Sequence, residues 1–183
     1  MQNGTQDTNI QGRSLVIIGA GGHGLSIASI ALSLGYKVAC FIDKYSDLEV
    51  LCGISVYKEL TQIQMTKNNH FAIGIGDNFK RDRIFQVLNS EHGELSFPPL
   101  IHPSAVIGAF TEIGIGTVLM PNVVVGPNSR VGNFCILNTQ SSIDHDCIMA
   151  SFSSLAPRAV TGGHVEIGRR TAIGLGACVK HQL

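Results

Sequence analysis

From Ile101 to Val179 an apolar residue returns at every sixth position, with mainly polar residues, glycine and small residues in between. Thirteen of these fourteen positions hold an aliphatic residue or Met, and only Thr161 departs from the rule. Four residues after each of the first thirteen stands a small or β-branched residue. Strands and helices repeat every 2 and 3.6 residues, so neither keeps a six-residue register over a dozen units. The pattern predicts a parallel β-helix, whose hexads bury their apolar residues by stacking on one another.

In such a β-helix three successive hexads make one triangular coil. The register divides the chain into four full coils, at residues 101–118, 119–136, 137–154 and 155–172. A fifth coil starts at Ile173 and is incomplete at Leu183. We therefore expect a β-helix domain over residues 101–183.

The first hundred residues follow a different pattern, in which short apolar runs alternate with helical spacing. Three apolar runs predict strands, at residues 14–18, 37–42 and 71–75. Helical spacing predicts three helices. The first follows residues 19–24, and the second covers about residues 57–65. The third begins at Asp77 or Asn78, either of which suits a helix cap. The alternation predicts a small Rossmann-like parallel sheet in an α/β domain over residues 14–97. Residues 1–13 are polar and predict a flexible leader.

Composition narrows the class of protein. The formal net charge is zero and no run is rich in Lys or Arg, which argues against an electrostatic nucleic-acid surface. No apolar run reaches the length of a membrane span and no signal peptide opens the chain. The cysteines, expected to be free thiols, indicate a reducing cytoplasm. The five cysteines are odd in number and lack metal-type spacing, so we expect no metal. Cys135 and Cys147 fall on the inward side of the repeat and predict buried thiols.

The first strand ends in Gly19-Ala20-Gly21-Gly22-His23-Gly24. Gly19, Gly21 and Gly24 match the G-x-G-x-x-G motif between a strand and a helix, where backbone N–H groups favour a phosphate. Asp43 follows the second strand, at the position of a ribose-binding acid. The domain is small, so a mononucleotide or the diphosphate of a nucleotide sugar suits it better than NAD. The alternative is that these glycines only allow close packing between strand and helix.

Together, the glycine motif and the hexads resemble those of the bacterial sugar O- and N-acetyltransferases with a left-handed β-helix. This family includes bacillosamine-type UDP-4-amino-sugar N-acetyltransferases, perosamine N-acetyltransferases and sialic-acid O-acetyltransferase relatives. The resemblance runs over residues 14–179, and its matching segments are residues 17–24, 41–43, 74–78, 101–105 and 138–147. It implies the left hand of the β-helix, which the period alone does not determine.

The chemistry is expected at Asp144-His145-Asp146, in a corner of the β-helix. Acetyl transfer from a thioester needs a base for the attacking amine or hydroxyl, and neutral imidazole suits that task. An adjacent carboxylate stabilises the imidazolium as it forms. On the residues alone, His145 and its flanking aspartates fit a solvated corner equally well. The resemblance implies that His145 is the catalytic base and Asp146 its acidic partner. For His23, a contact with a phosphate or the acceptor and a capping or surface role are equally open. The other histidines, which are His70, His92, His102 and His164, are expected to be structural or solvated.

The resemblance also implies the ligands. The acceptor is a nucleotide-activated amino sugar, and its candidate contacts are Gly19, Gly21, Gly22, His23, Gly24, Asp43, Asp77 and Asn78. Acetyl-CoA is the co-substrate and is expected along the β-helix of a homotrimer, with Gly163 and Gly176 as candidate contacts. The leading hypothesis is a sugar N-acetyltransferase. Alternatives are an O-acetyltransferase on sialic acid or a related acid sugar, a non-catalytic nucleotide-sugar-binding relative, and an NAD-linked enzyme.

Overall fold

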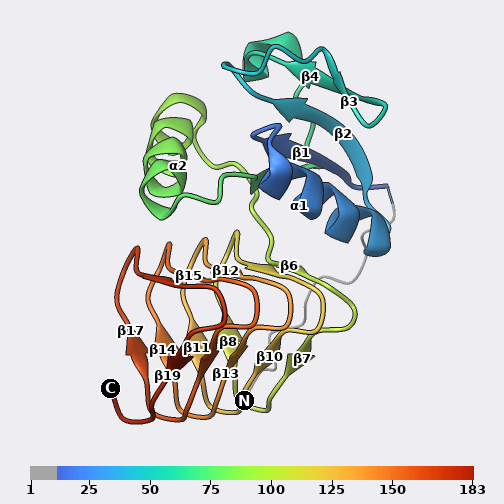
Figure 1. The fold of residues 1–183 in the computed structure, drawn as a ribbon. Helices are drawn as coiled ribbons and strands as arrows, with labels where there is room; N and C mark the ends of the chain where they lie inside the picture. The colour runs from blue at the N-terminus through green and yellow to red at the C-terminus, as the bar shows by residue number, and fades with distance from the viewer. Residues whose placement is uncertain (1–11) are drawn as a thin grey trace.

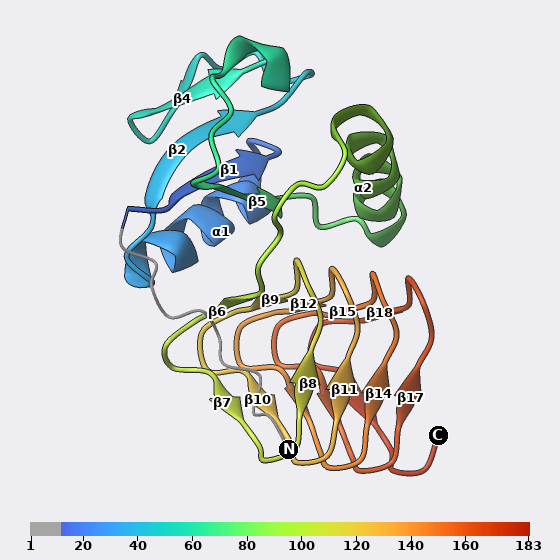
Figure 2. The same ribbon diagram turned by 180° about the vertical axis from the view of Figure 1, so that it is seen from behind.

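The computed structural model describes residues 12–183, which form an α/β domain and a three-sided β-helix (Figure 1). The flexible leader expected over residues 1–13 lies outside the described residues, apart from Gly12 and Arg13. Seen from the front and from behind, the α/β domain sits on one side of the β-helix (Figure 2).

The α/β domain is built on a five-stranded sheet in the order β3-β4-β2-β1-β5. Its strands are β1 (Ser14–Ile18), β2 (Lys37–Ile42), β3 (Val50–Leu51), β4 (Ile54–Tyr57) and β5 (Asn69–Ile73). All neighbouring pairs are parallel except β3 and β4, which form an antiparallel hairpin at the edge. Helix α1 (Gly22–Ser33) follows β1 and helix α2 (Asn78–His92) follows β5. The parallel α/β sheet predicted from the sequence is confirmed.

The prediction of a helix over about residues 57–65 is wrong. The chain there completes β4 and then makes a single 3₁₀ turn, η1 (Leu60–Gln62). Strand β4 pairs in parallel with β2, so this segment widens the sheet. The side chains of Glu59 and Gln62 cap the turn reciprocally, which closes one turn without starting a longer helix. Strand β5 also lies two residues earlier than the run expected at residues 71–75.

The β-helix begins at Leu100, and its two-residue strands stack into three parallel sheets. The β6 sheet contains β6 (Leu100–Ile101), β9 (Val118–Leu119), β12 (Ile136–Leu137), β15 (Ser154–Leu155) and β18 (Ala172–Ile173). The β7 sheet contains β7 (Val106–Ile107), β10 (Val124–Val125), β13 (Ser142–Ile143), β16 (Val160–Thr161) and β19 (Cys178–Val179). The β8 sheet contains β8 (Glu112–Ile113), β11 (Arg130–Val131), β14 (Ile148–Met149) and β17 (Glu166–Ile167).

The strand pairing confirms that three hexads make one coil. Val125, for example, pairs with Ile107 in the coil before and with Ile143 in the coil after. The exceptional Thr161 is buried, as are the other inward residues from Leu119 to Ile167. Its hydroxyl oxygen lies 3.6 Å from the sulfur of Cys147. Cys147 and Cys135 are buried free thiols, as predicted.

The two domains share one apolar interface. Helix α1 packs on the β6 sheet, where the outward side chains of Leu100, Val118 and Ile136 are buried. Helix α2 meets the turns between the β8 and β6 sheets through an aromatic cluster whose ring centroids lie 4.3 to 6.0 Å apart, formed by Phe85, Phe97, Phe134 and Phe152. Neither helix of residues 12–183 is both long and apolar enough to cross a bilayer.

Arg81 of α2 is the polar centre of this interface and is only 1% exposed. Its guanidinium donates to the backbone carbonyls of Phe134 and Phe152 in the β-helix, and of Ile75 and Gly76 in the α/β domain. A buried charge is tolerated only when its donors are satisfied in this way. Arg81 therefore ties the α/β domain to two successive coils.

Candidate active site

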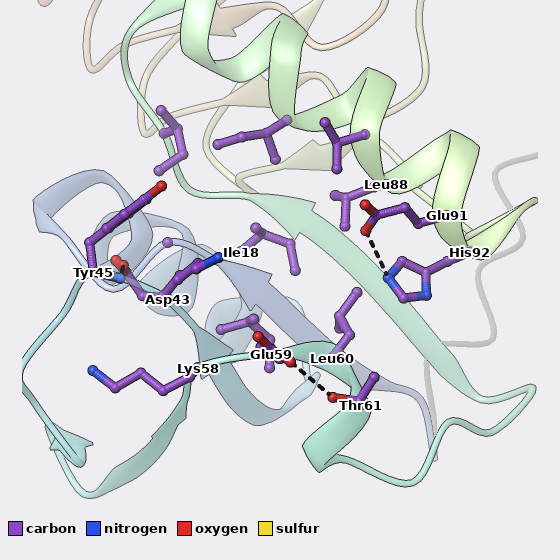
Figure 3. A pocket seen from close by; sticks show the side chains of 16 residues that line it. Ile18, Asp43, Tyr45, Lys58, Glu59, Leu60, Thr61, Leu88, Glu91 and His92 are labelled. Carbon is purple, nitrogen blue, oxygen red and sulfur yellow. Dashed lines mark hydrogen bonds and ion pairs between the residues drawn. The ribbon is translucent and has the colours of Figure 1, made fainter.

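A cleft of about 470 Å³ opens at the C-terminal ends of β1 and β2, between η1 and the end of α2 (Figure 3). Its apolar lining includes Ile18, Ile42 and Leu88, and its polar lining includes Asp43, Lys58, Glu59, Glu91 and His92. Gly19 also lines the cleft. Open parallel sheets bind ligands at this edge, because the loops that follow the strands gather there.

The structure separates the glycines of the loop into two kinds. Gly19 has φ +109°, which favours glycine, and a Cβ on Gly24 would overlap the Gly19 carbonyl oxygen. These two glycines allow α1 to pack closely on the end of β1. A Cβ on Gly21 or Gly22 would meet no atom within 4 Å, and both residues are exposed. The start of α1 has no side-chain cap, so its backbone N–H groups remain available for an anion.

Asp43 organises the loops beside the cleft. Its Oδ2 accepts a hydrogen bond from the backbone N–H of Ala20 at 2.9 Å, within the glycine loop. Its Oδ1 accepts from the backbone N–H groups of Tyr45 and Ser46 at 3.0 and 3.1 Å. The carboxylate is thus part of the cleft wall, and three backbone donors define its position.

Asp77 and Asn78 do not line the cleft. Asp77 caps α2 by accepting from the backbone N–H of Lys80 at 2.8 Å. Asn78 is 6% exposed, and its amide donates to Ser154 and accepts from Arg81 at the domain interface. We therefore correct the expectation that Asn78 contacts the acceptor, because its hydrogen-bonding groups are already used between the domains.

His23 points into the protein from the first turn of α1. Its Nε2 is buried and has no hydrogen-bond partner among the described residues. Burial, followed by the nearby charge of Arg81, lowers the pKa of His23 to about 4. The imidazole is therefore neutral near pH 7 and lies close to the domain interface.

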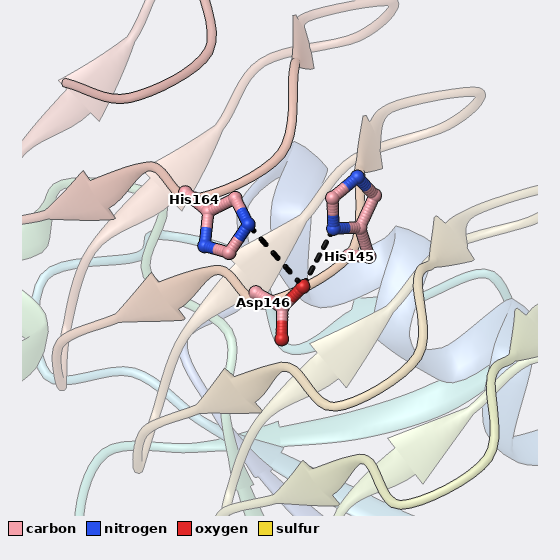
Figure 4. Close-up of side chains that lie close together, drawn as sticks. All are labelled: His145, Asp146 and His164. Atoms are coloured by element: carbon pink, nitrogen blue, oxygen red, sulfur yellow. Dashed lines mark hydrogen bonds and ion pairs between the residues drawn. The ribbon is translucent and has the colours of Figure 1, made fainter.

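His145 and Asp146 lie in the turn between β13 and β14 (Figure 4). Nδ1 of His145 and Oδ2 of Asp146 are 2.6 Å apart, and the His145 side chain is 48% exposed. The hydrogen bond with Asp146 raises the pKa of His145. The hydrogen bond from Asn128, followed by that from His145, lowers the pKa of Asp146. The pair therefore joins a carboxylate to an accessible imidazole whose other nitrogen points away from it.

The structure adds His164 to this corner, where the sequence analysis had expected a structural or solvated residue. Its Nε2 lies 3.6 Å from Oδ2 of Asp146, and its ring stands edge-on to that of His145 with centroids 5.2 Å apart. Asn128, Asp146 and His164 occupy the same position in three successive coils and share positive φ values of 56 to 58°. The coil length was thus a signal for this contact, since corner residues one coil apart stack on one another.

The two candidate acetyl-CoA glycines occupy different corners. Gly163 lies against His145, and a Cβ added to it would come within 2.6 Å of the imidazole Cε1 and Nε2. Gly176 lies in a turn from the β6 sheet to the β7 sheet, with φ +64° and open space around it. Gly163 therefore leaves room for the His145 ring, whereas Gly176 contacts no part of this cluster.

The histidine corner is remote from the cleft within one chain. The turns that join the β7 and β8 sheets form the edge of the β-helix farthest from the α/β domain (Figures 1 and 2). The glycine loop and the cleft belong to the α/β domain on the opposite side.

Comparison with known proteins agrees with both domains. Residues 14–88 match the PglD N-terminal domain, and residues 104–139 match the bacterial transferase hexapeptide family. The acetyltransferase domain of PglB from Neisseria gonorrhoeae FA1090 is 32% identical, with a TM-score of 0.84 over 93% of this chain and 83% of that one. A second structure of that domain contains acetyl coenzyme A and gives a TM-score of 0.85.

A perosamine N-acetyltransferase variant from Caulobacter crescentus, solved with CoA and GDP-perosamine, is 28% identical. Its TM-score is 0.85 over 92% of this chain and 80% of that one. The GDP-perosamine N-acetyltransferase of Escherichia coli O157:H7 is 35% identical over 79 residues, which are 43% of this chain. The match spans 36% of that curated relative. This chain therefore belongs to the bacterial sugar acetyltransferases that combine a PglD-type N-terminal domain with a β-helix of hexapeptide repeats.

Proposed function

We propose that this chain transfers the acetyl group of acetyl-CoA to the amino group of a nucleotide-linked amino sugar, with His145 as general base. The observation that carries this proposal is the pairing of His145 with Asp146 at 2.6 Å on an exposed corner. Support comes from the same fold in structures that contain acetyl coenzyme A, or CoA with GDP-perosamine.

The geometry fits direct transfer. With its Nδ1 proton donated to Asp146, neutral His145 has a lone pair on Nε2, which takes a proton from the attacking amine. The amine nitrogen forms a bond with the thioester carbonyl carbon, and the C–S bond then breaks. The imidazolium that forms is stabilised by the Asp146 carboxylate and returns its proton to the CoA sulfur. A backbone N–H is the expected donor to the oxyanion of the intermediate.

The α/β domain is proposed to hold the nucleotide end of the acceptor. The uncapped start of α1 at Gly21 and Gly22 favours the diphosphate, because its N–H groups and dipole attract negative charge. The cleft beside Gly19 and Asp43 is then available to the nucleoside. Gly163 and Gly176 remain proposed contacts of acetyl-CoA.

Assembly into a homotrimer is part of the proposal. The cleft and the histidine corner lie on opposite sides of one chain, so an acceptor held by one subunit reaches a base only on another subunit. A closed three-fold ring would give every subunit the same arrangement. We place the enzyme in the cytoplasm, since its five free cysteines suit a reducing compartment.

The test is release of CoA from acetyl-CoA with GDP-perosamine and UDP-4-amino sugars as acceptors, and with free sialic acids as the O-acetylation alternative. His145→Ala is expected to lower acetyl transfer by roughly 10²–10⁴-fold, the range for loss of a general base. The matched control is His102→Ala, which removes a histidine from another corner. Equal turnover in the two variants would reject His145 as the base, and turnover only with sialic acids would reject the amino-sugar acceptor.

A further inference from the structure

Three metal-ligating atoms converge at the histidine corner. His145, Asp146 and His164 each offer one ligand atom, and these three atoms lie within 4.8 Å of one another. Oδ2 of Asp146 is 2.6 Å from Nδ1 of His145 and 3.6 Å from Nε2 of His164. Two of them come from neighbouring residues, and the third comes from the position equivalent to Asp146 in the next coil. The linear sequence predicts no metal because only the winding of the β-helix brings these side chains together. We propose that His145, Asp146 and His164 form a Zn²⁺ site whose occupation inhibits the enzyme.

The donor set and the spacing suit Zn²⁺. Two imidazoles and one carboxylate are preferred by zinc over Mg²⁺ or Ca²⁺, which take all-oxygen sites. Bonds of about 2.0–2.1 Å in a tetrahedral site place ligand atoms roughly 3.3 Å apart. The observed separations are 2.6 Å between His145 and Asp146 and 3.6 Å between His164 and Asp146. The third separation, between the two histidines, is at most 4.8 Å. Both histidines are exposed, so modest rotations of their side chains would bring all three ligands onto one ion, with a fourth position open to water.

The surroundings orient the ligands. Asn128 donates to Oδ1 of Asp146 at 2.6 Å, which leaves Oδ2 facing the two histidines. The backbone N–H of His164 donates to the carbonyl of His145 at 3.0 Å, so the two histidines are aligned by the coil itself. Such outer hydrogen bonds orient metal ligands and are worth roughly 10- to 100-fold in affinity at other sites. Gly163 adds the space that the His145 ring occupies.

Zinc at this position would remove the proposed base; this consequence rests on the proposed function, whereas the binding itself does not. Zn²⁺ binds the lone pair of Nδ1, which exists only in the tautomer that carries its proton on Nε2. The proton moves from Nδ1 to Nε2 through solvent, and no electron is transferred. His145 then presents an N–H to the acceptor amine and has no lone pair to take its proton.

Binding is tested by titrating ZnCl₂ into the full chain and its variants by calorimetry, without substrates. His164→Ala and Asp146→Asn are expected to weaken this binding at least about tenfold. His102→Ala is the control and keeps it, since His102 bonds Ser104 at another corner. MgCl₂ is expected to give no binding at this site. Equal zinc binding in the wild-type chain and in His164→Ala overturns the site, whether or not the chain is active.

Inhibition is tested separately by assaying acetyl transfer with ZnCl₂ and after addition of EDTA. Zinc is expected to abolish transfer in the wild-type chain, and EDTA to restore it. His164→Ala is expected to need at least about tenfold more zinc for the same fractional inhibition. If zinc binding depends on His164 but acetyl transfer is unchanged by zinc, the proposed inhibition through Nδ1 of His145 is overturned. A chain that binds zinc through His164 yet has no acetyl transfer after EDTA contradicts the proposed function and leaves the site supported.

Discussion

Asn128 and Asp146 stack in successive coils, and Nδ2 of Asn128 donates to Oδ1 of Asp146 at 2.6 Å. This bond holds the carboxylate in the orientation in which Oδ2 faces His145. Sequence reasoning did not select Asn128, although it stands at the equivalent position one coil before Asp146. The contact extends the candidate site along the axis of the β-helix.

Asn128→Ala is therefore expected to lower kcat for acetyl transfer by roughly tenfold, less than loss of His145, because Asp146 remains present but is free to rotate. The measurement is steady-state CoA release at saturating acetyl-CoA. The matched control is Gln140→Ala, which breaks a similar corner ladder between Gln140 and Arg158 at 2.9 Å. Similar kcat losses in both variants would show that general disturbance of the corners, and not the orientation of Asp146, explains the effect.

Gly163→Ala is expected to lower kcat by roughly 10- to 100-fold, because the new methyl group would displace the His145 ring. The KM for acetyl-CoA measures the proposed donor contact separately: it rises together with the loss of kcat where Gly163 also contacts acetyl-CoA, and stays unchanged where Gly163 acts only through His145. The control is Gly174→Ala, since a Cβ there meets no atom within 4 Å. A rise in the acetyl-CoA KM with kcat unchanged would instead assign Gly163 to the donor site.

Two substitutions separate the roles of the glycine loop. In Gly21→Val the new side chain enters open space, so the melting temperature should stay unchanged. The KM for the nucleotide sugar should rise. Gly24→Ala should reduce the free energy of unfolding by about 1–3 kcal/mol or more, because its Cβ would overlap the Gly19 carbonyl. Thermal melts with and without the nucleotide diphosphate, together with acceptor kinetics, check both. Unchanged acceptor kinetics in Gly21→Val would count against phosphate binding at this loop.

The buried His23 predicts an acid-sensitive fold. The pKa of His23 is about 4 in the folded protein against 6.5 for an unperturbed histidine. Between these two pH values His23 is therefore protonated in the unfolded chain and neutral in the folded one. Stability from this group is complete above about pH 6.5 and is lost as the pH falls towards 4, at no more than about 1.4 kcal/mol per pH unit. Urea unfolding between pH 4.5 and 7 measures the slope, and His23→Gln should make it shallower. An identical slope in His23→Gln would show that other groups cause the acid sensitivity.

Local sequence patterns were sufficient to predict the β-helix and three strands of the α/β sheet. The six-residue period is local and repeated, so the period alone assigns each repeating apolar position from Leu119 to Leu155 to the interior, and these side chains are buried. The strands at residues 14–18 and 37–42 were equally clear. The prediction of a helix near residues 57–65 was wrong because this segment pairs with β2, and helical spacing does not reveal such a non-local contact.

The contacts of individual side chains, by contrast, depend on how the coils and the two domains pack together. Asn78 is buried between the domains because α2 rests on the β-helix turn that carries Ser154. His164 joins His145 and Asp146 because one full turn of the β-helix places its corner directly beside theirs. Periodicity assigns a residue to a face or a corner, whereas the atoms that meet there depend on contacts between coils and between domains.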